Sequence, residues 1–302
     1  MGVSVGVDVG GTKIVAGVPG PDGRLLDRED RATPDRASAP ILVEGLIADA
    51  VESLCARHDV RAVGVAAAGF VDAPGARVRF APHLSWRDEP LRDRLGARLG
   101  LPVLVANDAN AALWGEARFG AARGADHVLM VTLGTGIGGA LLVGGRLHTG
   151  RNGMAGEFGH MRVVPDGRPC ECGHTGCWEQ YCSGKALARF AREAGSVALG
   201  QALMEAASHG EPVAQGAFVE VGRWLGIGLA DLVAAFDPDL VLVGGGVSAA
   251  GELLLQPARR TFAEALVGSG HRKEPRILAA GLGPLAGLIG AADLAARAEE
   301  QR

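Results

Sequence analysis

The sequence lacks an excess of positive charge, and it has only five cysteines in 302 residues. Lysine and arginine number 30 against 34 aspartates and glutamates, which gives a formal net charge of −4. Since nucleic-acid-binding domains normally carry a basic face, we expect no nucleic-acid partner. Three of the cysteines fall between positions 170 and 177, which does not resemble the disulfide framework of a secreted protein.

Signals for export or membrane insertion are also missing from the pattern. Met1 leads directly into the alternating segment Val3–Asp8, without the basic and apolar regions of a signal peptide. The uncharged stretch 128–145 is long enough to span a membrane, but its six glycines and two threonines make it a poor spanning helix. We therefore expect a cytoplasmic protein with no membrane partner.

Glycine is abundant, with 47 residues and no G-X-Y period. Hydrophobic residues make up 48% and charged residues 21%, which is ordinary for a globular protein and excludes disorder. At ~150 residues per domain, the length corresponds to about two domains. So many glycines indicate backbone that passes close to other groups, and binding loops are expected there.

Hydrophobic periodicity and turn residues predict an α/β chain. The predicted strands are 3–9, 13–18, 24–26, 61–66 and 101–105. Helices are predicted to begin at Pro40, Pro212 and Pro284.

The order of elements is repeated. Residues 7–16 can be laid over residues 131–140, since both read as strand, glycine hairpin, strand. The segment 239–246 is similar to the buried strand that ends at Gly69. We expect two α/β domains around a cleft, one of residues 1–109 plus 285–302 and the other of residues 110–284.

The first glycine hairpin has the composition of a phosphate-binding loop. Gly10, Gly11 and Thr12 bring backbone N–H groups and a hydroxyl to one point, with little side chain in the way. Asp8 precedes them and would suit Mg²⁺ bound largely through water. The residues alone also fit a tight turn whose aspartate accepts hydrogen bonds from backbone amides.

The second hairpin, Gly134–Gly139, satisfies the G-x-G-x-x-G fingerprint of dinucleotide sites. That fingerprint requires a helix directly after the loop, whereas residues 140–145 read as strand and turn. A nicotinamide site is therefore excluded. A Walker loop is excluded too, because Ala186 follows Gly184-Lys185 and offers no hydroxyl to a metal.

Two kinds of acidic residue could act on a polar substrate. Asp108 follows a predicted strand, where ligands gather in open α/β sheets, so it could serve as a general base. By itself it fits equally well as the N-cap of a helix. Glu157 and Glu179 could accept hydrogen bonds from polyol hydroxyls, or they could simply be solvated.

The cysteine segment has the spacing of a metal site. Cys170, Cys172 and Cys177 supply three thiolates, and one further ligand would close a tetrahedral structural zinc site. Spacing allows either His160 or Cys182 as the fourth ligand. Three buried free thiols are the alternative.

Together, four segments resemble the ROK family of repressors and sugar kinases, and within it the bacterial glucokinases. The segments are Asp8–Lys13, Leu104–Asn110, Glu157–His160 and Cys170–Glu179. The resemblance covers essentially the whole chain, and the cysteine segment is its most specific part. It implies the duplicated actin-like ATPase fold, also described as ribonuclease-H-like, closing over a sugar and ATP.

The resemblance also implies roles for single residues. Asp108 is expected to be the catalytic base, and the zinc ligands are expected to be His160, Cys170, Cys172 and Cys177. The sugar-binding residues are expected to be Gly69, Asn107, Asp108, Glu157, His160 and Glu179. Residues expected at the nucleotide and its Mg²⁺ are Asp8, Gly10, Gly11, Thr12, Lys13, Thr135, Gly136, Gly244, Gly245 and Gly246. One departure is His83, where many relatives have asparagine.

The expected reaction is phosphorylation of glucose at the 6-hydroxyl by ATP, with Mg²⁺ and a structural Zn²⁺, in a dimer or tetramer of the chain. Another hexose, an N-acetylated amino sugar or polyphosphate as donor are alternatives within the family. A non-catalytic sugar sensor or repressor is a different class. It is disfavoured because family repressors carry a DNA-binding domain ahead of the first glycine loop, and Asp8 lies only seven residues after Met1.

Overall fold

The structure, a computed structural model, describes residues 2–301. The chain forms two compact units. The first comprises Met1–Gly124, Leu147–Ala155 and Gly281–Arg302, and the second comprises Ala125–Arg146 and Gly156–Ala280. Across residues 2–301, no helix has both the length and the apolar character needed to span a membrane. The stretch 128–145 forms strands, as its glycines suggested.

The first unit is built on a five-stranded sheet of order β3-β2-β1-β4-β8. Its strands are β1 (Val3–Val9), β2 (Lys13–Pro19), β3 (Leu25–Ala32), β4 (Val60–Ala67) and β8 (Val103–Asn107). β1 is antiparallel to β2 and parallel to β4, which is in turn parallel to β8. A small second sheet contains β5 (Phe70–Val71), β6 (Val78–Phe80) and β7 (Arg87–Glu89).

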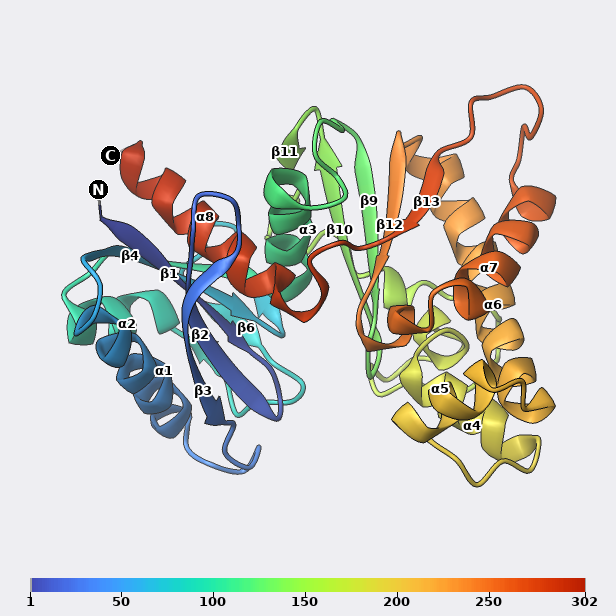
Figure 1. The fold of residues 1–302 in the computed structure, drawn as a ribbon, viewed down its shortest axis with the longest axis horizontal. Coiled ribbons are helices and arrows are strands. Elements are labelled where there is room, and N and C mark those ends of the chain that lie inside the picture. Colours follow the sequence, from blue (N-terminus) through green and yellow to red (C-terminus); the bar gives the residue numbers. More distant parts are fainter. Residues whose placement is uncertain (1, 302) are drawn as a thin grey trace. The chain divides into compact units, whose positions relative to one another are not determined.

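Helices cover both faces of the first sheet (Figure 1). They are α1 (Pro40–Cys55), α2 (Leu91–Leu99), α3 (Asp108–Phe119) and α8 (Ala286–Glu300), the last preceded by the short 3-10 helix η4 (Gly283–Leu285). Val5 and Val7 belong to the same core as Ile47 of α1. Between them, Gly6 faces α8, where a Cβ would overlap the carbonyl oxygen of Leu288. Gly6, placed between two valines of β1, therefore lets α8 approach the backbone of the sheet closely.

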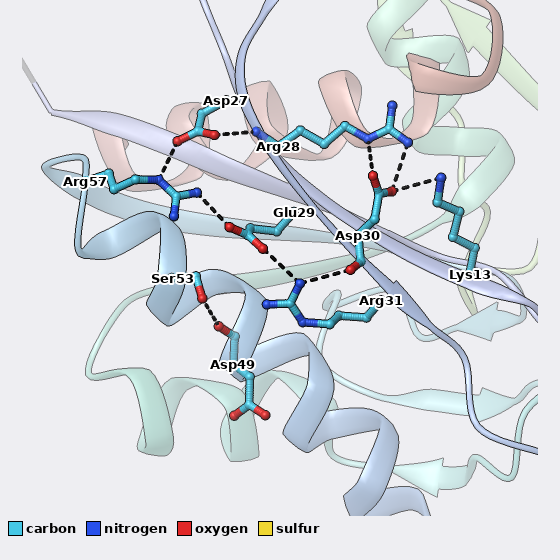
Figure 2. A network of polar contacts seen from close by, with 9 residues as sticks. All are labelled: Lys13, Asp27, Arg28, Glu29, Asp30, Arg31, Asp49, Ser53 and Arg57. Atoms are coloured by element: carbon cyan, nitrogen blue, oxygen red, sulfur yellow. Dashed lines mark hydrogen bonds and ion pairs between the residues drawn. The ribbon is translucent and has the colours of Figure 1, made fainter.

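The edge strand β3 carries a row of charged side chains of both signs (Figure 2). Arg57 donates hydrogen bonds to Asp27 and Glu29, both at 2.8 Å, and Lys13 of β2 pairs with Asp30 at 2.9 Å. Charged side chains on an edge strand disfavour pairing with a strand of another molecule.

The second unit repeats the plan of the first sheet, with the order β11-β10-β9-β12-β13. Its strands are β9 (Val128–Leu133), β10 (Ile137–Val143), β11 (Arg146–Leu147), β12 (Leu240–Gly244) and β13 (Arg276–Ala279). β9 and β10 form an antiparallel hairpin, and β12 lies parallel to both β9 and β13. The hairpin β9-β10 thus corresponds to β1-β2, and β12 corresponds to β4, as the sequence repeat predicted.

Long helices pack against this second sheet, among them α6 and α7, which lie side by side (Figure 1). The α-helices are α4 (Gly184–Glu193), α5 (Gly200–Ser208), α6 (Pro212–Phe236) and α7 (Glu252–Ala265). Short 3-10 helices are η1 (Phe158–His160), η2 (Trp178–Gln180) and η3 (Gly246–Ala250). Leu129 and Val131 of β9 share one core with Phe218 and Val221 of α6.

The compact units divide the chain at other points than the expected domain boundaries after residues 109 and 284. Helix α3 is grouped with the first unit because it packs along α8. There Trp114 donates to Asp293 at 2.8 Å, and a Cβ on Gly290 would overlap the carbonyl oxygen of Ala111.

Candidate active site

The candidate base, Asp108, is held at the junction of β8 and α3. Asn107 caps α3, because its Oδ1 accepts a hydrogen bond from the N–H of Asn110 at 3.1 Å. Its Nδ2 donates to Asp108 Oδ1 at 3.0 Å and to the carbonyl of Gly69 at 3.1 Å. The capping role that the sequence left open for Asp108 is therefore wrong, because Asn107 fills it. Asn107 instead fixes the orientation of the Asp108 carboxylate.

A second carboxylate, that of Asp8, interacts electrostatically with Asp108. Asp8 lies on β1 in register with Ala66 of β4, which in turn lies in register with Ala106 of β8. Burial, and after it the charge of Asp108, raises the pKa of Asp8 to about 7. Burial also raises the pKa of Asp108, against hydrogen bonds from Ala109 and Asn107 that lower it. Such a pair suits a proton or a divalent cation.

The first glycine loop joins β1 to β2 within the same unit. The N–H of Gly10 donates to the carbonyl of Lys13 at 3.0 Å and closes the turn. Thr33 supports the loop from outside, because its hydroxyl donates to the carbonyl of Gly10 at 2.8 Å. Gly11 and Thr12 are exposed at the tip. Lys13 is directed to Asp30 on β3 (Figure 2), so this lysine would have to turn to reach a phosphate in the loop.

His83 lies beside this loop, and Gly69 lies against the segment that carries His83. A Cβ on Gly11 would stand 2.9 Å from the Cβ of His83, and one on Gly69 would stand 3.0 Å from Ala81 Cα. The segment that carries His83 is fixed by Arg87, which donates to the carbonyls of residues 81, 84 and 86 at 2.9, 3.1 and 2.6 Å. His83 therefore borders the glycine loop, although the sequence marked it only as a departure from the family pattern.

The predicted metal ligands come together in the second unit. The ligand atoms of His160, Cys170, Cys172 and Cys177 all lie within 4.8 Å of one another. Individual separations are 3.8 Å from Cys170 Sγ to His160 Nδ1 and 3.5 Å between the sulfurs of Cys172 and Cys177. Three thiols and an imidazole are a set that zinc binds as a closed tetrahedral site.

Local backbone bonds shape this cluster. The N–H of Cys170 donates to the carbonyl of His174 at 2.8 Å, and Gly173, with φ +90°, donates back to Cys170 at 3.0 Å. Cys182, the other ligand that spacing allowed, lies fully buried in the apolar core of the second unit, outside the four-residue group.

The two candidate glutamates differ in their surroundings. Glu179 lies on η2 beside the cluster, with Oε1 3.1 Å from Cys170 Sγ and 3.8 Å from His160 Nδ1. Glu157 is exposed, although the residues that follow it, Phe158 and Gly159, are buried. The loop around Glu157 is thus packed, while Glu157 itself is exposed.

The second glycine loop connects β9 to β10, so the strand expected directly after this loop is confirmed. Its backbone is closed by the N–H of Gly134, which donates to Gly136 at 3.0 Å. Gly244 ends β12 in register with Thr132 of β9. Gly245 has φ +82°, and a Cβ on this residue would overlap the backbone of Leu133. Thr135 and Gly136 therefore lie at the same end of the second sheet as Gly244–Gly246.

The expected site residues thus form two groups, one in each unit. The first unit holds Asp8, Gly10, Gly11, Thr12, Lys13, Gly69, Asn107 and Asp108. The second holds Thr135, Gly136, Glu157, His160, Cys170, Cys172, Cys177, Glu179, Gly244, Gly245 and Gly246.

One structurally important acid was missed by the sequence analysis. Glu116 of α3 is fully buried and accepts hydrogen bonds from the N–H groups of Ala121 and Leu282, both at 2.7 Å. These two residues lie close to the points where the chain passes between the units in sequence. A glutamate in an amphipathic helix is usually solvated, so nothing in the local sequence marks this one.

Comparison with known proteins decides the family. The ROK family model matches residues 4–298. The chain belongs to the ROK family. Within it, the glucokinase of Streptomyces coelicolor is 46% identical over 98% of both chains. The glucokinase of Halalkalibacterium halodurans is 37% identical over 95% of this chain and 92% of its own.

A solved ROK structure agrees with the fold. The ROK glucokinase of Streptomyces griseus, in complex with glucose and AMPPNP, is 50% identical and covers 98% of this chain and 100% of its own, with a TM-score of 0.90. The resemblance deduced from the sequence and the duplicated α/β fold are thereby confirmed.

Proposed function

We propose that this ROK protein is a glucokinase, which transfers the γ-phosphoryl group of ATP to the 6-hydroxyl of glucose. The observation that carries the proposal is the Asp108 carboxylate, oriented by Asn107 at the carboxyl end of β8. It belongs to a chain that is 50% identical to an enzyme solved with glucose and an ATP analogue.

Asp108 would accept the proton of the sugar hydroxyl as the new bond to phosphorus forms. Phosphoryl transfer depends mainly on alignment of the reactants and neutralisation of charge. Beyond these, the protein has to supply a correctly placed acceptor for the proton of the sugar hydroxyl. Burial raises the pKa of Asp108, which makes its ionised form a better base. The hydrogen bond from Asn107 keeps the carboxylate in one orientation.

Sugar contacts would come from Gly69, Asn107, Glu157, His160 and Glu179. Both N–H bonds of the Asn107 amide are used within the protein, so a sugar hydroxyl would donate to its Oδ1. Glu157 and Glu179 would each accept from sugar hydroxyls. Sites matched to hydroxyls in this way reject analogues that leave buried polar groups unpaired.

The nucleotide would be held mainly by backbone. Exposed N–H groups at the tips of both hairpins would bind phosphate oxygens, with Lys13 adding positive charge, and Gly244–Gly246 would lie at the adenosine. Mg²⁺, when bound, neutralises phosphate charge, and Asp8 beside Asp108 is suited to hold it through water. The cluster of His160, Cys170, Cys172 and Cys177 would hold a structural Zn²⁺ that fixes the loop carrying Glu179.

A substrate panel tests the proposal. Glucose, mannose, fructose, N-acetylglucosamine and N-acetylmannosamine would each be assayed with ATP and with polyphosphate. We expect the highest kcat/KM for glucose with ATP. A higher value for an amino sugar or for polyphosphate would move the function to that alternative, and no turnover with any pair would indicate a sugar sensor. Size-exclusion chromatography would test the proposed homo-oligomer.

A further inference from the structure

The second glycine loop has an unusual neighbour, the carboxylate of Glu179. Glu179 Oε2 occupies the space that a Cβ on residue 136 would need, and the carboxyl carbon would lie 3.4 Å from that Cβ. The other oxygen, Oε1, lies 3.1 Å from Cys170 Sγ. One short side chain therefore spans the distance from the metal-ligand cluster to the hairpin between β9 and β10.

Backbone conformation does not explain the glycine at position 136. Its φ lies outside the left-handed region that favours glycine, unlike that of Gly245 at +82°. The φ of residue 136 therefore does not demand glycine, and a side chain at this position would instead displace the carboxylate end of Glu179. The absence of a side chain there is what allows the carboxylate of Glu179 to lie against the loop.

The segment that carries Glu179 is itself rigidly attached. Trp178 is fully buried, and its Nε1 donates to the carbonyl of Trp224 on α6 at 2.8 Å. A few residues on, the N–H of Gly184 donates to the carbonyl of Gly134 at 2.8 Å. The loop is thus supported at two points by residues 179–184, one a side-chain contact and the other a backbone hydrogen bond.

From this geometry we infer that Glu179 is a positioning residue for the second phosphate loop, and that nucleotide affinity depends on its side chain even when no sugar is bound. The inference rests on the proposed function, in which Thr135 and Gly136 bind phosphate. The glycines at positions 134 and 136 contribute no side chains that would hold the shape of the loop, so the neighbouring Glu179 side chain sets the direction of the loop's N–H groups. Glu179 would thereby link the sugar and nucleotide sites.

Binding of AMPPNP with Mg²⁺ to the sugar-free full-length protein tests this role, because a residue that only contacts sugar would not change it. Isothermal titration calorimetry would compare wild type, Glu179→Gln, Glu179→Ala and the exposed helix α4 variant Glu193→Ala. We expect Kd to rise about 10-fold in Glu179→Ala, because the loop loses the side chain that packs against Gly136. Glu179→Gln keeps the shape of the side chain beside Gly136, so its Kd for AMPPNP should stay within about 3-fold of the wild-type value. The Kd of Glu193→Ala should stay within the same range.

Zinc content would be measured in each variant, and wild-type nucleotide affinity in zinc-loaded Glu179→Ala would overturn the inference. If Glu179→Ala loses zinc, Gly136→Ala provides the second test, because its new methyl group would displace the Glu179 carboxylate. Gly136→Ala should weaken AMPPNP binding to the sugar-free protein several-fold, and unchanged AMPPNP affinity would overturn the inference. Failure of the proposed function would look different, since the wild type itself would then neither bind AMPPNP nor phosphorylate glucose.

Discussion

Asp8 and Asp108 lie at the carboxyl ends of two strands that are separated by a single strand, and their charges interact. Burial and the neighbouring charge of Asp108 together raise the pKa of Asp8 to about 7. A carboxyl group with this pKa is partly protonated near neutral pH when no cation is present. The pair therefore makes both stability and metal binding sensitive to pH.

The first prediction follows from the sign of that shift. An aspartate of the unfolded chain has a pKa of about 3.9, so between roughly pH 4 and 7 the folded protein binds more protons than the unfolded one. Asp8 therefore lowers the free energy of unfolding as pH rises through this window. In metal-free buffer, the difference in Tm between Asp8→Asn and wild type should rise from pH 5 to pH 8. Each kcal/mol by which the wild type loses free energy of unfolding over this range corresponds to a Tm difference of roughly 2–4 °C.

Asp59→Asn is the matched control, because the Asp59 side chain is 78% exposed. Its Tm should track that of the wild type at both pH values. An Asp8→Asn variant whose Tm differs from wild type by the same amount at pH 5 and pH 8 would contradict the raised pKa.

The second prediction concerns Asp108. Asp108→Asn keeps the size of the side chain but removes the proton acceptor, so kcat should fall by about 10²–10⁴-fold. Glucose affinity, measured by calorimetry, should change far less. The exposed α2 variant Asp93→Asn serves as a control and should keep wild-type kcat. Near-normal turnover in Asp108→Asn would remove this residue as the base.

The third prediction distinguishes the metal ligands from the neighbouring buried cysteine. Wild-type protein should contain about one zinc ion per chain, measured by elemental analysis. Cys172→Ser should release it and weaken glucose binding, because in the proposed function the metal would fix the loop that carries Glu179. Cys182→Ser should retain the zinc, because Cys182 lies outside the cluster. Zinc loss in Cys182→Ser with retention in His160→Ala would assign the ligands the other way.

The fourth prediction concerns Glu116. Glu116→Ala removes the acceptor of two backbone N–H groups, those of Ala121 and Leu282. Each unsatisfied buried donor costs about 1–3 kcal/mol, so the Tm should fall by several degrees. Glu300→Ala at the exposed end of α8 should leave it unchanged. A wild-type Tm in Glu116→Ala would show that water replaces the carboxylate at no cost.

Local patterns were sufficient for much of the fold. The valines at alternate positions of β1 mark the face that shares a core with α1, and the prolines at positions 40 and 212 each begin a helix. The repeated hairpin at residues 131–140 predicted the second sheet. Each of these features depends on residues close together in the chain, where side-chain periodicity and turn chemistry are decisive.

Long-range relationships could not be obtained in this way. That α3 packs along α8, that His160 rather than Cys182 joins the three cysteines, and that Glu116 is buried all depend on segments far apart in the sequence. The same holds for the contact between Glu179 and Gly136.

By itself, then, the sequence determined the repeated α/β plan, the glycine hairpins and the composition of a zinc cluster, because spacing along one chain fixes them. Only the tertiary structure decided that Asn107, and not Asp108, caps α3. It also decided that the charge of Asp108 raises the pKa of Asp8. Which group accepts a hydrogen bond, and what a carboxylate's pKa becomes, depend on the neighbours that folding brings within a few ångströms.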